Sequence, residues 1–132
     1  MFDHVSIAVS DLDQAVAIYE AALAPLGIVR LWRSERAAGF GPPGFTGEAP
    51  LALVVPRQGA VAPSPASHLA FAAPNREAVQ GFHAGALAAG AADDGPPGIR
   101  ESYDPGYYAA FVLDGDGRRL EAVVHEDGVR GG

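Results

Sequence analysis

The stretch YYAAFVLDGDGRRLEAVVH, residues Tyr107–His125, decides the fold of this chain. It contains two runs of mostly apolar, β-branched and aromatic residues, separated by the sequence DGDG at 114–117. Asp and Gly are the residues that tight turns between antiparallel strands require. The stretch therefore predicts a β-hairpin, around which the remaining elements can be arranged.

Glu121 is the one acidic residue in the second run of this predicted hairpin. Successive side chains of a strand point to opposite faces, so Glu121 shares its face with Val123 and His125. A carboxylate among apolar neighbours costs several kcal/mol unless water, a polar partner or a metal ion stabilises it. At this point a solvated face and a metal site are both open interpretations.

The length of 132 residues and the composition are those of one globular domain. The formal net charge of −7 argues against nucleic acid or an anionic membrane as the partner. The chain has no cysteine, which excludes disulfide scaffolds, thiolate zinc sites and cysteine nucleophiles. Neither a membrane span nor a secretory signal is visible, so we expect a cytoplasmic protein.

Apolar periodicity places the elements that precede the hairpin. Residues 3–9 alternate and predict a strand, and the three- and four-residue spacing from Leu12 to Leu23 predicts a helix. Asp11 is suited to cap that helix, and Pro25 and Gly27 end it. Further strands are expected over 28–36, 38–40 and 51–55, followed by a linker over 57–67.

The same pattern then begins again at His68. HVSIAVSDLDQAVAIYEAAL from His4 aligns with HLAFAAPNREAVQGFHAGAL from His68 at a constant offset of 64. LALVV at 51–55 aligns with LEAVV at 120–124 at an offset of 69, and a longer loop at 91–106 accounts for the difference. We infer an α+β fold with an internal repeat of a β-α-β-β-β unit. The predicted single domain covers 1–132, with module one at about 1–57, a linker at about 58–66 and module two at about 67–127.

The repeat makes His4 and His68 equivalent and gives Glu121 the counterpart Ala52. Two imidazoles and one carboxylate leave positions open on a divalent metal, which is the arrangement of many non-haem iron sites. Zinc, manganese or nickel are also compatible with such ligands. We therefore predict that His4, His68 and Glu121 bind a divalent metal ion of unknown identity.

These features resemble the vicinal oxygen chelate superfamily, which includes glyoxalases, extradiol dioxygenases, fosfomycin-resistance enzymes and bleomycin-resistance proteins. The resemblance is carried by DHVSIAVSDLDQAVAIYEAAL, SHLAFAAPNREAV and YYAAFVLDGDGRRLEAVV. It implies two tandem βαβββ modules that form an open curved sheet or half-barrel around a cavity, metal ligands at His4, His68 and Glu121, and a homodimer. The chain departs from the pattern at Ala52, where glyoxalase-like members have a second Glu or another ligand.

Other residues are candidates by their position. Tyr107 and His125 are candidate catalytic residues, with packing and a solvent-exposed strand end as the alternative interpretations. Arg33, Arg36 and Arg100 are able to meet an anionic substrate, although solvated arginines are the alternative. The candidate substrate-binding residues are Ser6, Trp32, Phe40, Tyr103 and Phe111.

Two functions are consistent with these residues. Without a second carboxylate at Ala52, a two-base isomerisation is harder to assemble, whereas three ligands suit a metal that polarises a bound oxygen. The sequence favours a divalent-metal-dependent lyase or dioxygenase that acts on a small oxygen-chelating substrate. Fosfomycin chemistry is less favoured because Phe111 stands where that group commonly has Tyr. The alternative is a non-catalytic protein that sequesters a small aromatic or drug-like compound, as bleomycin-resistance proteins do.

Overall fold

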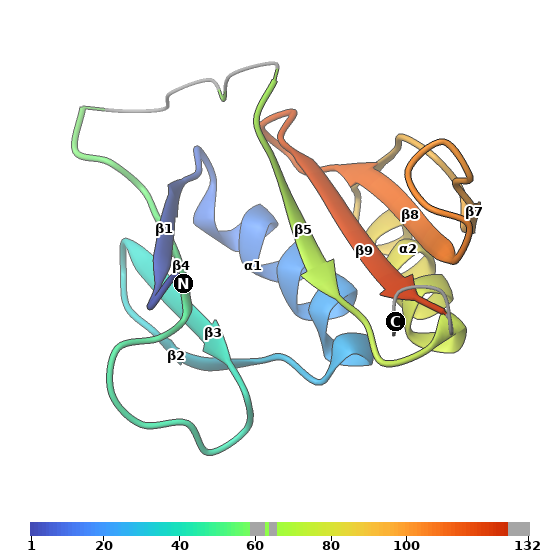
Figure 1. The fold of residues 1–132 in the computed structure, drawn as a ribbon. Helices are drawn as coiled ribbons and strands as arrows, with labels where there is room; N and C mark the ends of the chain where they lie inside the picture. The colour runs from blue at the N-terminus through green and yellow to red at the C-terminus, as the bar shows by residue number, and fades with distance from the viewer. Residues whose placement is uncertain (59–62, 64–65, 127–132) are drawn as a thin grey trace.

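The chain folds as two halves of the same design. A computed structural model describes residues 1–58, 63 and 66–126, so most of the expected linker lies outside the described residues. The first half contains β1 (Val5–Ala8), α1 (Leu12–Leu23), the 3-10 helix η1 (Ala24–Leu26), β2 (Val29–Arg33), β3 (Ala37–Gly41) and β4 (Leu51–Val54) (Figure 1).

The second half repeats the first, except that two short strands take the place of β2. The stretch 91–106, which the sequence analysis expected to be a loop, contains both of them, and each pairs with β8 as β2 pairs with β3. The elements are β5 (His68–Ala72), α2 (Arg76–Ala88), β6 (Ala92–Asp93), β7 (Gly98–Ile99), β8 (Tyr107–Leu113) and β9 (Arg119–His125).

Each half forms its own mixed sheet, and neither sheet is closed. The first sheet has the order β1-β4-β3-β2 and the second β5-β9-β8-β6, with β7 also on β8. β1 pairs in parallel with β4, and β5 pairs in parallel with β9, while the predicted hairpin β8–β9 is antiparallel. The predicted α+β fold with two βαβββ units is confirmed. β1 and β5 are edge strands, and each leaves one row of backbone groups without a strand partner among the described residues.

Both helices begin at side-chain caps in equivalent positions. Asp11 Oδ1 accepts a hydrogen bond from the backbone N–H of Gln14, and Asn75 Oδ1 accepts one from Ala78. Such caps satisfy backbone donors that the first turn of a helix leaves unpaired. η1 follows α1 directly and ends at Gly27, whose φ of 82° is unfavourable for residues with a side chain. No helix of the described residues is long and apolar enough to cross a membrane.

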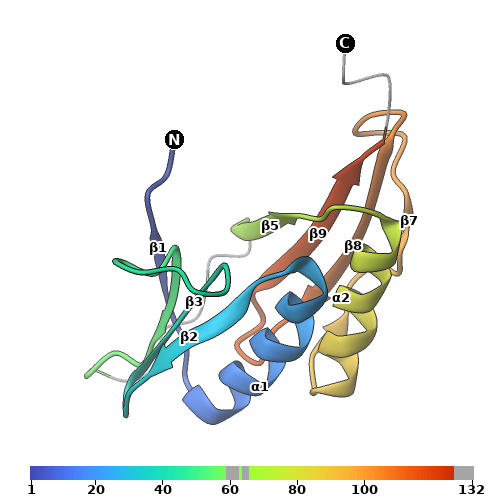
Figure 2. The same ribbon diagram turned by 90° about the horizontal axis from the view of Figure 1, so that it is seen from below.

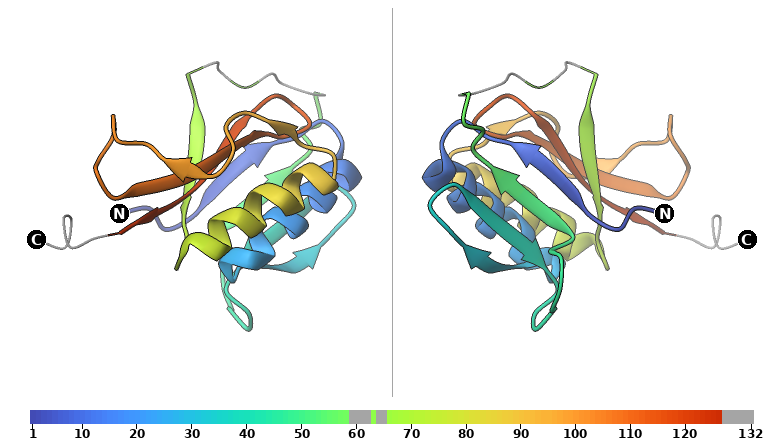
Figure 3. Two further views of the ribbon diagram at one scale, coloured as in Figure 1. Left: turned by 90° about the vertical axis from the view of Figure 1, so that its right-hand side faces the viewer. Right: turned by 90° about the vertical axis from the view of Figure 1, so that its left-hand side faces the viewer.

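α1 and α2 lie side by side, with the first sheet on one side and the second on the other (Figures 2 and 3). They approach closely at Gly85, where an added Cβ would lie 2.5 Å from the carbonyl oxygen of Ala21. One core cluster contains buried residues of both helices and of both sheets, including Tyr19, Leu53, Phe82 and Leu120. The helix layer is therefore shared, and each sheet packs one face toward it.

Strand alternation gives each sheet a second face, which we call the outer face because its residues are not those packed on the helices. On the first sheet the outer face carries Ser6 opposite Ala52, with His4 preceding β1 on the same side. On the second sheet it carries Ala70 opposite Glu121, and Glu121 opposite Phe111. Since both inner faces belong to one core, the two outer faces of a chain turn away from each other.

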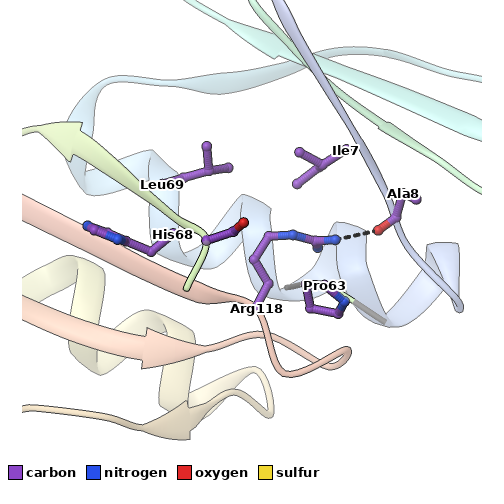
Figure 4. A pocket seen from close by; sticks show the side chains of 7 residues that line it. Ile7, Ala8, Pro63, His68, Leu69 and Arg118 are labelled. Atoms are coloured by element: carbon purple, nitrogen blue, oxygen red, sulfur yellow. Dashed lines mark hydrogen bonds between the residues drawn. The ribbon is translucent and has the colours of Figure 1, made fainter. Parts of the chain in front are cut away.

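The β8–β9 turn joins the second half to the first. Asp114 Oδ2 accepts hydrogen bonds from the Tyr19 hydroxyl, at 2.7 Å, and from Arg118 Nη1, at 2.8 Å. Arg118 Nη2 donates to the carbonyl oxygen of Ala8 at 2.7 Å, across a pocket between the halves (Figure 4). Asp116 accepts hydrogen bonds from the backbone N–H and the hydroxyl of Ser10. These contacts fix how the two halves are oriented.

Candidate functional site

Glu121 is the centre of the candidate site. Only 1% of its surface is exposed, and it lies in the middle of β9 on the outer face of the second sheet. Its Oε2 accepts a hydrogen bond from the Tyr107 hydroxyl, and its Oε1 lies 3.3 Å from His68 Nε2. The solvated-face interpretation of Glu121 is therefore wrong, because this carboxylate is taken from water and stabilised by two polar partners.

Tyr107 reaches Glu121 along the sheet surface. In the β8–β9 register Tyr107 is opposite His125, and Glu121 is four residues before that position. Burial raises the pKa of the Tyr107 hydroxyl, and the hydrogen bond and negative charge of Glu121 raise it further, while the positive charge of Arg119 lowers it. The hydroxyl thus keeps its proton at neutral pH and acts as a donor to the carboxylate.

An aromatic group borders the site on the Tyr107 side. The Tyr103 ring meets the Tyr107 ring edge to face with a centroid distance of 4.8 Å, and the His125 ring does so at 5.1 Å. His125 Nδ1 also lies 3.9 Å from Asp104 Oδ2. The predicted residues Tyr103, Tyr107 and His125 are thus brought together, at the end of the hairpin away from its turn.

His4 does not share these surroundings. Its Nδ1 lies 2.7 Å from Asp3 Oδ1 and its side chain is 47% exposed, on the outer side of the first sheet. The hydrogen bond to Asp3 raises the pKa of His4. Within residues 1–58, 63 and 66–126, no group of three or more His, Cys, Asp or Glu side chains is arranged to hold a metal ion. One chain thus brings together two of the three predicted ligands, His68 and Glu121.

The remaining predicted substrate-binding residues fall in different places. Ser6 is on the outer face of the first sheet, and the Trp32 ring lies over Gly39, where an added Cβ would be 2.3 Å from Trp32 Nε1. Phe40 is fully buried in the core, 6.3 Å from Tyr19 between ring centroids, and it also lines a cavity described below. Phe111 is on the outer face of the second sheet, directly opposite Glu121.

The sequence analysis missed Arg119. Its guanidinium carbon lies 4.1 Å from the centroid of the Phe111 ring, on the face that carries Glu121. The signal was present in the strand alternation, because residues two apart on β9 point to the same side. By itself this signal is weak, since an arginine next to a turn is usually solvated.

Two of the cavities formed by the described residues lie between the halves. One, of about 230 Å³, is lined by Ile7, Ala8, Pro63, Ser67, His68, Leu69 and Arg118 (Figure 4). The other, of about 770 Å³, is mainly apolar and follows the free edge of β5, between that strand and the first sheet. Its lining includes Val5, Phe40, Leu51, His68 and Phe71. A volume of this size is in the range of small-molecule sites.

Comparisons with known proteins agree with this architecture. The profile described as Glyoxalase/Bleomycin resistance protein/Dioxygenase superfamily matches residues 1–122. A comparison with curated protein sequences finds no match. Among solved structures, a glyoxalase/bleomycin resistance protein from Albidiferax ferrireducens T118 is 30% identical, with a TM-score of 0.81 over 93% of this chain and 98% of that one.

Two more distant structures share the fold. A glyoxylase/bleomycin resistance protein/dioxygenase domain from Frankia sp. EAN1pec is 24% identical, with a TM-score of 0.69 over 96% of this chain and 98% of that one. The fosfomycin resistance protein FosX from Listeria monocytogenes is 15% identical, with a TM-score of 0.69 over 98% of this chain and 97% of that one. With the profile match over most of its length, this chain belongs to the glyoxalase/bleomycin resistance protein/dioxygenase superfamily.

Proposed function

We propose that this protein is a divalent-metal-dependent enzyme, a lyase or an oxygenase, that acts on a small substrate chelating the metal through adjacent oxygens. The metal ligands are His68 and Glu121 of one chain and His4 of a second copy. The proposal rests on one observation, the buried Glu121 carboxylate with His68 Nε2 3.3 Å from its Oε1. Members of the superfamily generally use a divalent metal.

The separation of this pair suits two ligands of one ion. Two atoms bound at about 2.1 Å, with their bonds at angles between 90° and tetrahedral, lie about 3.0–3.4 Å apart. A charge-assisted N–H···O hydrogen bond is shorter, at about 2.7–2.9 Å. The observed 3.3 Å therefore falls in the range expected for two ligands of one cation and outside that of a short charge-assisted hydrogen bond. Tyr107 holds the other carboxylate oxygen, as outer hydrogen bonds to metal ligands commonly do.

The third ligand is assigned to a second copy because of how the halves are oriented. The α1–α2 contact and the Asp114 hydrogen bonds turn the two outer faces of a chain away from each other. A two-fold dimer that pairs the outer face of the first sheet with the outer face of the partner's second sheet forms two identical sites. The edge strands β1 and β5 gain neighbours in the same assembly.

When bound, the metal supplies Lewis acidity that stabilises negative charge on the substrate's chelating oxygens. The chain's own residues do the rest. Tyr107 keeps the Glu121 carboxylate oriented, and its proton stays on the hydroxyl because its pKa is raised. His125, beside the Tyr107 ring, is the candidate for proton transfer, and Tyr103 forms an aromatic wall. Because Ala52 offers no second carboxylate, the proposed chemistry is one that uses a single acid/base group besides the metal.

Metal content tests the proposal directly. The wild-type protein, supplemented with iron, manganese, nickel or zinc and then dialysed, should retain about one ion per chain of at least one of these metals. His4→Ala and Glu121→Gln should each lose it, while His83→Ala, which removes a histidine on α2 next to Asp93, should retain it. If the wild-type protein holds no metal after all four supplements, the proposal of a metal-dependent enzyme is refuted.

Mixing the two inactive variants tests whether the site is shared. If sites form between chains, half of the dimers formed from equal amounts of His4→Ala and Glu121→Gln are mixed, and each mixed dimer has one intact site. About a quarter of the wild-type metal content should return after co-refolding. If the mixture stays free of metal while the wild type is loaded, the three ligands do not come from two chains.

A second candidate function is sequestration of a small apolar molecule without chemistry. The cavity of about 770 Å³ along β5 favours it, since it is mainly apolar and His68 is a polar group at its wall. Under this alternative, the wild type would hold no metal, and an environment-sensitive dye such as ANS would bind one site per chain. Phe71→Asp would abolish dye binding in the cavity, whereas Glu121→Gln would leave it unchanged.

A further inference from the structure

Two arginine side chains lie against the ring of Phe111, on the outer face that carries Glu121. The guanidinium carbon of Arg119 is 4.1 Å from the ring centroid, and that of Arg100 is 5.4 Å away. Phe111 is 2% exposed and directly opposite Glu121 in the β8–β9 register. A guanidinium within about 6 Å of a ring centroid is attracted by the negative face of the ring. Phe111 therefore holds two positive charges beside the row that contains Glu121.

Arg119 keeps part of its guanidinium available. Its Nε donates a hydrogen bond to Asp94 Oδ2 at 2.9 Å, and the side chain is 37% exposed. Among the described residues, no other hydrogen-bond acceptor contacts this guanidinium. The Asp94 contact and the Phe111 ring fix its orientation, and the two terminal nitrogens form an edge that matches the two oxygens of a carboxylate or phosphate.

Arg100 adds charge without a neutralising acid. Its Nη2 donates to the carbonyl oxygen of Pro96 at 2.7 Å, and no carboxylate of the described part of the chain lies within ion-pair distance of it. Two glycines make room for it. A Cβ added at Gly95 would lie 3.1 Å from both Arg100 Nη2 and Phe111 Cδ1, and one added at Gly98 would lie 3.0 Å from Arg100 Nη1. The loop before β8 is thus shaped around this side chain.

The arginines are placed beside the proposed metal ligands. In the β5–β9 register His68 is opposite Arg119, and the next pair on the same face is Ala70 and Glu121. The chain as a whole carries a formal charge of −7, so these two arginines form a local exception to a surface that repels anions. A ligand anchored at Glu121 with a negative group toward the β8–β9 turn would meet Arg119.

We propose that Arg119, oriented by Phe111 and Asp94 and supported by the charge of Arg100, binds an oxyanion group of the substrate. The inference rests on the proposed function, because it takes the ligand of His68 and Glu121 to be that same substrate. The substrate class is then a small molecule with adjacent oxygens at one end and a carboxylate or a phosphate at the other.

Anion binding to the full-length protein tests this inference. The probes are phosphate and acetate, titrated at constant ionic strength with sodium chloride as the reference, and the readout is the saturable shift of backbone amide NMR signals in β8 and β9. The protein is first treated with EDTA, so that no probe binds through a metal. We expect phosphate or acetate, but not chloride, to give saturable shifts. The tighter of the two identifies a phosphate-bearing or a carboxylate-bearing substrate.

Four variants assign the binding to Arg119. Arg119→Gln should raise the dissociation constant of the bound anion, phosphate or acetate, about tenfold, and Arg100→Gln should raise it about threefold. Asp94→Asn keeps an oxygen for Nε but removes a competing negative charge, so it should lower the constant severalfold. Arg30→Gln, which removes an arginine paired with Glu20 far along the chain, should leave it unchanged.

Unchanged binding in Arg119→Gln, or chloride shifts equal to those of phosphate and acetate, would overturn the inference. If Arg119→Gln fails to fold, Asp94→Asn is the deciding variant. An anion dissociation constant that is unchanged in Asp94→Asn would also overturn the inference. The two proposals fail separately. If the protein binds phosphate at Arg119 but retains no metal, the anion site is supported and the metal-dependent enzyme is refuted. If the protein retains metal but its anion binding is unchanged in Arg119→Gln, the enzyme is supported and the anion site is refuted.

Discussion

The Tyr19 hydroxyl, on α1, donates a 2.7 Å hydrogen bond to Asp114 Oδ2, in the turn of the β8–β9 hairpin. The two residues belong to different halves of the chain, and both are buried. Arg118 completes the contact, because it binds Asp114 with one nitrogen and the carbonyl oxygen of Ala8 with another. Burial, together with the charge and hydrogen bond of Asp114, raises the pKa of Tyr19, so its hydroxyl stays protonated and donates to Asp114 at neutral pH.

Removing the Asp114 carboxylate should destabilise the protein strongly. Asp114→Ala leaves the Arg118 guanidinium buried without its counter-charge, which we expect to lower the free energy of unfolding by about 3–5 kcal/mol. Tyr19→Phe removes one hydrogen bond and should cost about 1 kcal/mol. Urea unfolding followed by circular dichroism measures both. The control is Glu20→Gln, which removes an exposed ion pair between Glu20 and Arg30. This control should lower the free energy of unfolding by less than about 1 kcal/mol. A loss in Asp114→Ala no larger than in this control would contradict the prediction.

The helix crossing should tolerate no larger residue on α2. Gly85→Ala normally favours a helix by about 1 kcal/mol, but here the added methyl group would lie 2.5 Å from the carbonyl oxygen of Ala21. We expect a net loss of about 1–3 kcal/mol in the free energy of unfolding, from overpacking. Ala84→Gly, at an exposed position of α2, is the control for helix propensity and should cost about 1 kcal/mol. A stabilised Gly85→Ala protein would show that the helices are able to move apart.

Tyr107→Phe should weaken metal binding without abolishing it. The variant removes the hydrogen bond that orients Glu121 but leaves both ligands, so we expect the metal dissociation constant to rise about 10–100-fold. Competition with a chromophoric chelator measures this change. Tyr108→Phe is the matched control, because its hydroxyl accepts a hydrogen bond from Gln80 on the helix side of the same strand. If Tyr107→Phe and the wild type bind the metal with equal affinity, Tyr107 has no role in orienting Glu121 for metal binding.

The ion pair between Arg76 and Glu126 should make stability depend on acidic pH. The hydrogen bonds from Arg76 hold the pKa of Glu126 below its usual value of 4.5. Since the folded-state pKa is lowered, the stabilisation is complete above pH 4.5 and is lost as the pH falls through the folded-state value. Glu126→Gln should thus unfold at a lower urea concentration than the wild type at pH 7. The difference between the two midpoints should shrink as the pH falls below 4.5, and a difference that stays constant would assign the effect to something other than this charge.

Much of the fold follows from the sequence because it is local. The alternating runs, the helix cap Asp11 and the turn at 114–117 are each determined by neighbouring residues, and the structure confirms all three. β1, β2 and β4 are shorter than the predicted runs, because the ends of a run need no ladder partner, whereas β3 is longer than its predicted run. β6 and β7 could not be predicted, since two-residue strands exist only through their pairing with β8.

The site follows from the sequence only in part. Alternation placed Glu121 and His125 on one face, and the repeat made His4 and His68 equivalent, but equivalence does not say which faces meet. That depends on the packing of α1 on α2 and on Asp114, contacts between residues far apart in the chain. The bond between Tyr107 and Glu121 was missed for a similar reason, because it spans two rows of the sheet. Metal binding by His4, His68 and Glu121 stays a prediction.

The contact of Gly85 with Ala21 has a consequence for the origin of the chain. Gly85 is the counterpart of Ala21 in the repeat, at the offset of 64, so the two helices touch at corresponding points. Corresponding points of two copies meet only at their axis of symmetry. A single ancestral half would therefore have paired with itself through this spot, under the requirement that the residue there be small. In the present chain the two copies are joined end to end, and they differ at the site, where one copy has Glu121 and the other has Ala52.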